Sequence, residues 1–325
     1  MRWKRLEQRY HAHKNCVTDL LTILRKHNVN FSCVNRVELD RQHLADVDLL
    51  VAVGGDGTVL SSAHFLDHGT IPLLGINSDP NQIKEDRIVK GKKSDERRSH
   101  GALCTCTSID MEQVLDEVLY GGGTVEQRRR IRCKVKSTFS ETRMVPALND
   151  ILIANPSPAA VSRFRMGWLQ LLNSDEKDVS VYGTITRFGT KAYAVSNSIN
   201  VWSSGIWVCT STGATAAMQA AGGKSMPDLC SPDMQYLIRE HIIEGRATGT
   251  SLQEANYGVL DNDINNAMIR DGEKVHMRWN SQRGRIFIDG AHLTHNLELG
   301  DEISIDNEAP PLQLLARSFD RNSLK

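Results

Sequence analysis

Apolar residues recur at helical spacing near the start of the chain and then gather in short runs divided by glycine. Val17, Leu20, Leu21 and Leu24 predict a helix over 14–26. Further helices are predicted over 59–66 and 111–120, the second capped by Ser108 and stopped by Gly121, and strands over 29–34, 48–53 and 71–76. Strands alternating with helices favour a parallel, doubly wound α/β sheet. Its ligand is expected at the carboxyl ends of the strands.

The pattern changes to an alternation of period two near residue 131. Ile131, Cys133 and Val135 alternate with basic residues, and short strand-like runs follow as far as Ile288. Helical signal is confined to the residues after Thr212 and to 236–243. A second, β-rich domain is therefore predicted to begin near 128, after an exposed run Arg128-Arg129-Arg130.

The glycine-rich loop Gly54-Gly55-Asp56-Gly57-Thr58 stands between a predicted strand and a predicted helix. Glycines at such a turn let the backbone approach a ligand, and the helix start offers N–H groups to phosphate oxygens. The carboxylate of Asp56 suits an enzyme that removes a proton from a hydroxyl of a nucleotide. An ordinary tight turn, with Asp56 as the helix N-cap, explains the same residues.

Two other glycine-containing segments fail as nucleotide motifs. Gly223-Lys224-Ser225 has Met218 where a phosphate-binding loop of the Walker type needs its first glycine. The run 121–123 follows a helix-like stretch and lacks the glycine pattern of a dinucleotide fingerprint.

Two polar segments are further candidates for binding. Asn149 and Asp150 stand between apolar Leu148 and Ile151, so their side chains must find partners in a buried setting. An ordinary turn is the alternative. Thr210, Thr212 and Thr215 surround Gly213 after a strand-like run, with Ala216 beside them, and would bring backbone and hydroxyls close to a flat ligand. The alternative is a helix start built from small residues and packed on a sheet.

Taken in order, these segments resemble the NAD kinase family. The glycine-aspartate loop alone is shared with diacylglycerol kinases, sphingosine kinases and 6-phosphofructokinases. The resemblance extends over roughly residues 48–305 and rests on segments 54–58, 148–151, 205–217, 221–223, 288–290 and 299–305. Segments 76–80, 158–164 and 216–219 look like the plant NADH kinases and their organellar relatives.

The resemblance implies an N-terminal α/β domain over 1–128, with 300–325 packing back on it, and a β-sandwich-like domain over 129–299, with the active site between them. It implies transfer of the γ-phosphoryl group of ATP, as its Mg²⁺ complex, to the 2′-hydroxyl of the adenosine ribose of NADH or NAD. Asp56 would be the base. The nucleotide-binding residues would be Gly54, Gly55, Gly57, Thr58, Asn149, Asp150, Thr210, Thr212, Gly213, Thr215 and Ala216.

Within the same resemblance, Arg98 would contact phosphate, and the protein would be a homodimer. Residues 79–98 are rich in charges of both signs, which predicts a solvated loop or lid. Ser204 and Ala217 depart from the aspartate and tyrosine that many family members carry there, so contacts to the nucleotide bases and the choice between NADH and NAD are open at these positions.

Composition removes several other classes of protein. Lys and Arg number 39, as do Asp and Glu, so no net charge attracts nucleic acid. No run of about 18 apolar residues predicts a membrane span, and no signal peptide is indicated. We expect a cytoplasmic protein, with a mitochondrial or peroxisomal location as the alternative. Seven scattered cysteines predict buried, reduced thiols rather than a zinc site.

Two functional alternatives follow from the same loop. A lipid kinase of the diacylglycerol or sphingosine type would use Asp56 but needs an apolar acceptor pocket and a membrane-facing patch, and the sequence indicates neither. A non-catalytic sensor would bind NAD(H) through Asn149 and Asp150 without turnover. The presence of Asp56 argues against the sensor.

Overall fold

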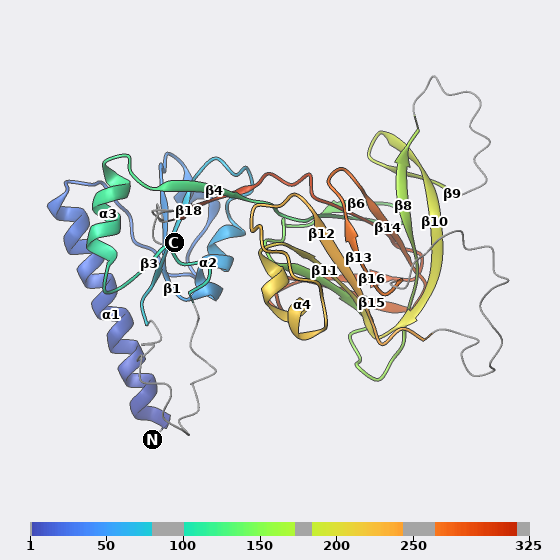
Figure 1. Ribbon diagram of the computed structural model, residues 1–325, viewed down its shortest axis with the longest axis horizontal. Coiled ribbons are helices and arrows are strands. Elements are labelled where there is room, and N and C mark those ends of the chain that lie inside the picture. The colour runs from blue at the N-terminus through green and yellow to red at the C-terminus, as the bar shows by residue number, and fades with distance from the viewer. Residues whose placement is uncertain (1, 80–100, 173–183, 243–263, 317–325) are drawn as a thin grey trace, which may run out of the picture. The chain divides into compact units, whose positions relative to one another are not determined.

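The computed structural model describes residues 2–79, 101–172, 184–242 and 264–316. The chain forms two compact units, the first from residues 1–127 and 311–325 and the second from 128–310 (Figure 1). The second segment of the first unit begins at 311 rather than at 300, because the strand over 302–306 pairs within the second unit.

The first unit has a mixed order of helices and strands around one sheet. Its elements are α1 (Arg2–Lys26), the 3₁₀ turn η1 (Arg41–Leu44), β1 (Leu50–Gly54), α2 (Asp56–Ala63), β2 (Leu73–Asn77), β3 (Cys106–Thr107), α3 (Met111–Leu119), β4 (Thr124–Arg128) and β18 (Leu312–Ala316). The sheet order is β1-β2-β18-β4, with β3 also paired to β2. Strands β1, β3 and β18 all run parallel to β2, which confirms the α/β prediction.

Helices cover both faces of this sheet (Figure 1). On one face, α1 and α3 pack against Leu74 and Ile76 of β2 in a single apolar cluster. On the other face, a Cβ atom placed on Gly75 would lie 2.9 Å from a methyl of Val59 in α2. Successive residues of a strand point to opposite faces, so glycine at 75 lets α2 approach the sheet closely.

The helix predicted over 14–26 is confirmed as part of α1, which begins earlier, at Arg2, because several residues before Lys14 are good helix formers despite a weak apolar pattern. Two other local predictions for this unit were wrong. Residues 29–34 form no strand, although Val29 and Phe31 pack against the apolar cluster. Ser108 does not cap α3, which follows Asp110; that carboxylate binds the Thr107 amide at 2.7 Å instead.

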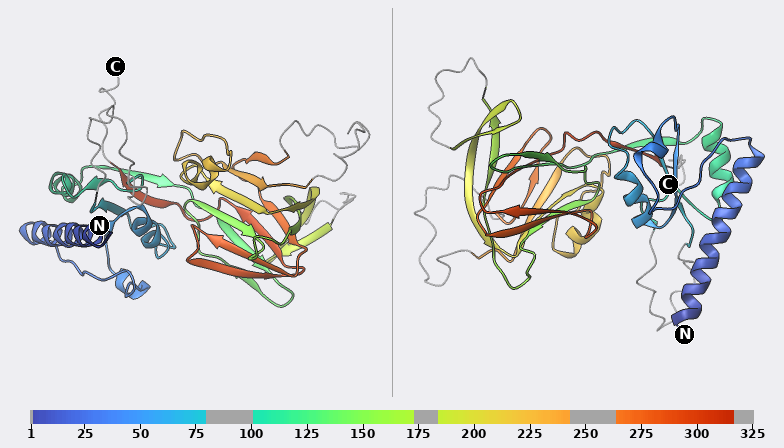
Figure 2. Two further views of the ribbon diagram at one scale, coloured as in Figure 1. Left: turned by 90° about the horizontal axis from the view of Figure 1, so that it is seen from below. Right: turned by 180° about the vertical axis from the view of Figure 1, so that it is seen from behind.

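The second unit consists of two sheets built from antiparallel pairs (Figure 2). The seven-stranded sheet has the order β6-β5-β17-β14-β8-β10-β9, and the six-stranded sheet has the order β13-β12-β11-β7-β15-β16. The strands are β5 (Arg132–Lys136), β6 (Glu141–Arg143), β7 (Asp150–Ala154), β8 (Ser162–Leu171), β9 (Thr184–Phe188), β10 (Lys191–Ser203), β11 (Gly205–Thr210), β12 (Met234–Arg239), β13 (Asn266–Ile269), β14 (Val275–Trp279), β15 (Arg283–Ile288), β16 (Leu293–Glu298) and β17 (Glu302–Asp306). The 3₁₀ turn η2 (Gly213–Thr215) and helix α4 (Ala217–Ala220) follow β11.

One apolar core lies between these sheets. It joins Met166, Met277 and Ile303 of the larger sheet to Ile151 and Val208 of the smaller one, as expected for a sandwich. The helix predicted over 236–243 is wrong, because Met234–Arg239 forms β12. Short apolar runs buried on both faces look alike in helices and strands.

The basic run before this unit is not an exposed linker. Arg128 is 5% exposed and Arg130 is 1% exposed. The Arg130 guanidinium donates to the Pro310 carbonyl oxygen at 2.7 Å, and Arg128 donates to the Thr212 hydroxyl at 3.4 Å. Buried arginines need such partners, so this run belongs to the structure of the second unit.

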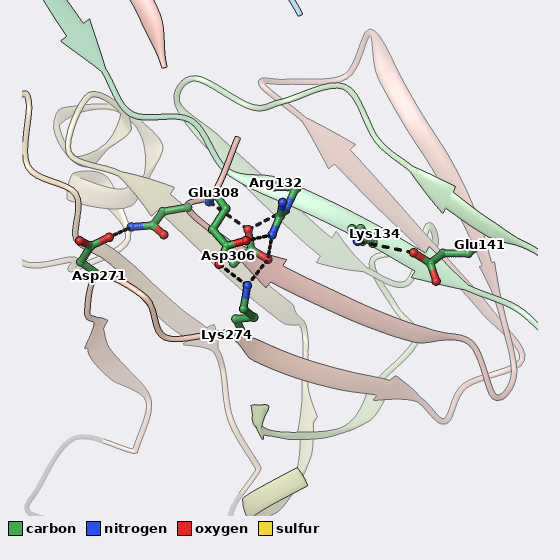
Figure 3. A network of polar contacts seen from close by, with 8 residues as sticks. Arg132, Lys134, Glu141, Asp271, Lys274, Asp306 and Glu308 are labelled. Atoms are coloured by element: carbon green, nitrogen blue, oxygen red, sulfur yellow. Dashed lines mark hydrogen bonds and ion pairs between the residues drawn. The ribbon is translucent and has the colours of Figure 1, made fainter. Parts of the chain in front are cut away.

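Charged side chains link three neighbouring strands of the larger sheet (Figure 3). The Arg132 guanidinium of β5 lies 2.8 Å from both carboxylate oxygens of Asp306, the last residue of β17. Lys274, which precedes β14, lies 3.6 Å from Asp306, and Glu308 pairs with both cations. Asp306 is 3% exposed, so its charge depends on these partners.

We expect Asp306→Asn to lower the free energy of unfolding by about 2 kcal/mol. A buried pair that loses one partner costs ~3–5 kcal/mol, and Glu308 keeps part of the compensation here. Chemical denaturation measures the change. Lys134→Gln is the matched control, since Lys134 lies 3.6 Å from the more exposed Glu141 and should cost under ~1 kcal/mol. Equal losses in the two variants would contradict the importance of the Asp306 cluster.

Candidate active site

The glycine-aspartate loop joins β1 to α2 in the first unit. Gly55, with extended backbone angles of φ −104° and ψ −174°, is the N-cap of α2, so the proposed N-cap role of Asp56 is wrong. A Cβ atom on Gly54 would lie 2.3 Å from the Thr58 hydroxyl oxygen. Glycine at 54 therefore lets the helix turn back against the end of its own strand.

Asp56 is held by the segment that precedes β3. Its Oδ1 atom accepts the Leu103 amide at 2.8 Å, and its Oδ2 atom accepts the Gly101 amide at 3.1 Å. Each carboxylate oxygen has two lone pairs, so these bonds fix the group without exhausting its capacity to accept a proton. The same bonds serve the fold, because they anchor residues 101–103 beside the loop.

The loop amides differ in their availability to phosphate. The Thr58 amide donates to the Gly55 carbonyl oxygen at 2.8 Å, so its expected contact to phosphate competes with an internal bond. The amides of Asp56 and Gly57 lie in the first helical turn, where no carbonyl stands four residues earlier in the helix. Gly57 is exposed, and a Cβ atom there would meet nothing within 4 Å. The protein's own packing thus does not require glycine at 57.

In the second unit, Asn149 and Asp150 lie at the start of β7 against the end of β11. The Thr210 amide donates to the Asn149 carbonyl oxygen at 3.0 Å, and its hydroxyl donates to the Leu148 carbonyl oxygen at 2.5 Å. A Cβ atom on Gly213 would lie 2.1 Å from the Asn149 carbonyl oxygen. Any other residue at 213 would separate the two segments, so this glycine sets their contact.

Asp289 lies in segment 288–290, which carries part of the family resemblance, but the sequence did not indicate that it contacts Asn149 and Asp150. Its carboxylate accepts the amides of Leu148, Asn149 and Asp150 at 2.8, 2.7 and 3.0 Å. It follows β15 and occupies the left-handed region with φ +49°. The Asp289-Gly290 pair is a turn signal in the sequence, but nothing local indicates a bond to residues 140 positions away.

Asp150 carries its carboxyl group in a buried position, with 8% of the residue exposed. Burial, and next the charge of Asp289, raise the pKa of Asp150 to about 7. Burial and then the charge of Asp150 raise the pKa of the neighbouring Cys209 thiol to about 12. Asp150 therefore changes its charge near neutral pH, while Cys209 stays a thiol.

The segment after β11 presents both buried and exposed groups. Thr210, Thr212 and Gly213 are buried, and Thr215 and Ala216 are exposed. Gln235, which is fully buried on β12, binds both the amide and the carbonyl of Lys224 at 2.8 and 2.7 Å. The sequence did not indicate these bonds to the segment 223–225, because a glutamine in an apolar run gives no sign of its partner.

The structure thus gathers the predicted residues into two groups. Gly54, Gly55, Asp56, Gly57 and Thr58 form one loop of the first unit, and Asn149, Asp150, Thr210, Thr212, Gly213, Thr215 and Ala216 form one cluster of the second. Arg98 and the charged segment over 80–98 lie outside the described residues.

The described ranges show neither a cluster of metal-ligand side chains nor a membrane-spanning helix. Within them, no three or more His, Cys, Asp or Glu side chains gather as a metal ion would require. No helix there combines the length and apolar character needed to cross a membrane. Cys16, Cys106, Cys133 and Cys209 are buried thiols, whereas Cys33 and Cys230 are exposed, contrary to the prediction for these two.

The chain is similar to known proteins along most of its length. The model of the ATP-NAD kinase N-terminal domain matches residues 4–79. A probable NADH kinase of Oryza sativa subsp. japonica is 34% identical over 95% of this chain and 83% of its own. NADH kinase of Arabidopsis thaliana is 37% identical over 95% of this chain and 85% of its own.

Solved structures show the same fold. Yeast NADH kinase complexed with NADH has a TM-score of 0.58 and 18% identity, covering 86% of this chain and 65% of its own. An NAD kinase from Archaeoglobus fulgidus in complex with ATP has a TM-score of 0.59 and 17% identity, covering 93% of this chain and 90% of its own. With the identity and coverage of the plant relatives, these findings confirm the resemblance. The chain belongs to the NAD kinase family.

Proposed function

We propose that this chain is a kinase that transfers the γ-phosphoryl group of ATP to the 2′-hydroxyl of the adenosine ribose of NADH or NAD, giving NADPH or NADP. The observation that carries the proposal is that plant NADH kinases are 34–37% identical to this chain over 95% of its length. The neighbouring structures hold NADH and ATP, which supports these nucleotides as substrates.

Asp56 acts as the general base in this reaction. Its carboxylate takes the proton of the ribose hydroxyl as the hydroxyl oxygen bonds to the γ-phosphorus, and the bond from that phosphorus to the bridging oxygen breaks to release ADP. The amide bonds from Gly101 and Leu103 orient the carboxylate. Such a base contributes ~10²–10⁴-fold to the rate, and positioning supplies much of the rest. The first-turn amides of α2 face phosphate oxygens.

Asn149 and Asp150 hold the acceptor. The amide of Asn149 can both donate and accept, and the ionised carboxylate of Asp150 can accept bonds from ribose hydroxyls or from the adenine amino group. Mg²⁺ enters as its complex with ATP, because this ion keeps several waters and binds largely through substrate phosphates. The homodimer and the cytoplasmic location stay predictions.

The alternatives predict different products. Incubation with ATP, Mg²⁺ and each of NADH, NAD and diacylglycerol separates a nucleotide kinase from a lipid kinase. A sensor would bind NADH in calorimetry and form no phosphorylated product with any acceptor. The plant NADH kinase relatives support the nucleotide kinase.

We expect Asp56→Asn to lower turnover ~10²–10⁴-fold while NADH still binds, since the amide keeps the shape but cannot take the proton. Initial rates and NADH calorimetry measure the two effects. The matched control is Asp110→Asn, because Asp110 also holds backbone in the first unit through the Thr107 amide at 2.7 Å. Near-normal turnover in Asp56→Asn would remove its role as base.

The affinity for NADH should rise as the pH increases through about 7, the value to which burial and Asp289 raise the pKa of Asp150. Only ~10% of the carboxyl is ionised one pH unit below its pKa, so binding at pH 6 should be ~5–10-fold weaker than at pH 8. Asp150→Asn should bind NADH more weakly at pH 8 and lose this pH dependence. Calorimetry from pH 6 to 8.5 decides the matter.

The sign of the same titration can be checked without a ligand. The folded protein binds a proton at Asp150 between its ordinary pKa of 3.8 and about 7, so wild-type stability should decline as the pH rises across this range. Asp150→Asn removes that decline, and its stability relative to the wild type should grow from pH 4 to 7. An unchanged difference would show that Asp150 titrates elsewhere.

We expect a higher kcat/KM for NADH than for NAD. NAD carries one more positive charge on the nicotinamide ring than NADH does. Many family members have an aspartate where this chain has Ser204. Loss of that carboxylate favours the neutral ring of NADH if residue 204 lies within about a Debye length of the ring, ~8–10 Å. Ser204→Asp should shift the ratio towards NAD, and Ser204→Ala, the uncharged control, should not. A wild-type preference for NAD in initial-rate competition would leave the kinase standing and defeat this prediction.

A further inference from the structure

We propose that Asp289 is a positioning residue of the acceptor site, where its carboxylate holds the backbone of residues 148–150 in the geometry that binds the nucleotide. The proposal rests on the assignment of Asn149 and Asp150 as acceptor ligands. Asp289 receives all three amides of this segment, at 2.7 to 3.0 Å. In return, its own amide donates to the Asp150 carbonyl oxygen at 2.9 Å.

This contact fixes the backbone that carries the side chains of Asn149 and Asp150. A hydrogen bond from an amide to a charged oxygen is shorter and stronger than one to a neutral acceptor. With three successive amides aimed at one carboxylate, the peptide planes on both sides of Asn149 are set. The opposite side of the segment is set by Thr210 and by the close approach of Gly213 to the Asn149 carbonyl. The Asn149 side chain is therefore attached to a backbone that has little freedom to rotate.

A role confined to the hairpin between β15 and β16 does not explain this geometry. Asp301, in the turn between β16 and β17, shows what such a role looks like. Its carboxylate accepts the Glu298 amide at 2.9 Å, and its own amide donates to the Glu298 carbonyl, so both bonds stay inside one turn. The Asp289 carboxylate instead accepts the amides of residues 148–150, which lie about 140 positions earlier in the chain.

The charge of Asp289 also reaches Asp150. After burial, it is the second cause that raises the pKa of Asp150 to about 7. The other titratable group facing Asp150 is Cys209 on β11, which is a neutral thiol in this range because its own pKa is raised to about 12. Removing the Asp289 charge should therefore lower the pKa of Asp150 even where the fold, and with it the burial of Asp150, is kept.

The test compares Asp289→Asn and Asp289→Gly with the wild type. Asparagine and glycine both tolerate the positive φ of this position, so neither strains the backbone. Asp301→Asn is the matched control for losing a turn carboxylate. NADH affinity is measured by calorimetry without ATP from pH 6 to 8.5, and thermal unfolding is followed in parallel. These readouts do not require turnover.

At pH 8 and above, where Asp150 is ionised in the wild type and the variants alike, we expect both Asp289 variants to bind NADH at least ~10-fold more weakly. The pH midpoint of binding in Asp289→Asn should fall below that of the wild type. Asp301→Asn should keep the wild-type affinity and midpoint. An unchanged affinity or midpoint in the Asp289 variants would overturn the proposal, as would failure of both to fold, since the carboxylate would then serve the whole domain.

Asp150→Asn separates this proposal from the function on which it rests. If Asp150→Asn weakens NADH binding and the Asp289 variants do not, only the positioning role fails. If Asp150→Asn and Asn149→Ala both leave the affinity unchanged, the acceptor site itself is misplaced.

Discussion

Three successive backbone amides at the start of β7 share one acceptor, the Asp289 carboxylate, and the candidate site of the second unit depends on this contact. Backbone N–H groups withdrawn from water must be paired, and the Asp289 carboxylate pairs those of residues 148–150. The same anchor joins the end of β15 to the beginning of β7, two strands that are already neighbours in the smaller sheet. The geometry of the site is therefore a continuation of the sheet rather than a property of a free loop.

This arrangement has an electrostatic cost. The Asp289 carboxylate lies near the buried carboxyl of Asp150 and disfavours its ionisation. The raised pKa of Asp150 reflects both its burial and this neighbour. A ligand that donates hydrogen bonds to Asp150 offsets the cost, because it favours the ionised form. Shifted carboxyl pKa values are common at binding sites, and the pKa of Asp150 agrees with the proposed acceptor role.

Sequence reasoning succeeded where the signal is local and failed where it depends on distant partners. The order of strand, glycine loop and helix around Asp56 is a local pattern, and β1 and α2 follow it. Residues 29–34 carry a strand-like pattern because Val29 and Phe31 are needed in the core, but a pattern of burial does not supply a neighbouring strand. Residues 236–239 are buried on both faces, so periodicity could not separate helix from strand. Asp289 and Arg128 act through residues far along the chain, and no local pattern encodes that.

Three glycines of the site, and Gly75 of the neighbouring sheet, differ in what they permit. Gly54 and Gly213 are required by the protein itself, since a Cβ atom at either would overlap Thr58 or the Asn149 backbone. Gly75 likewise admits α2 to its sheet. Gly57 stands apart, because it is exposed at the start of a helix, a position where alanine would stabilise the fold. The packing of the free protein therefore does not account for glycine at 57 as it does at 54 and 213.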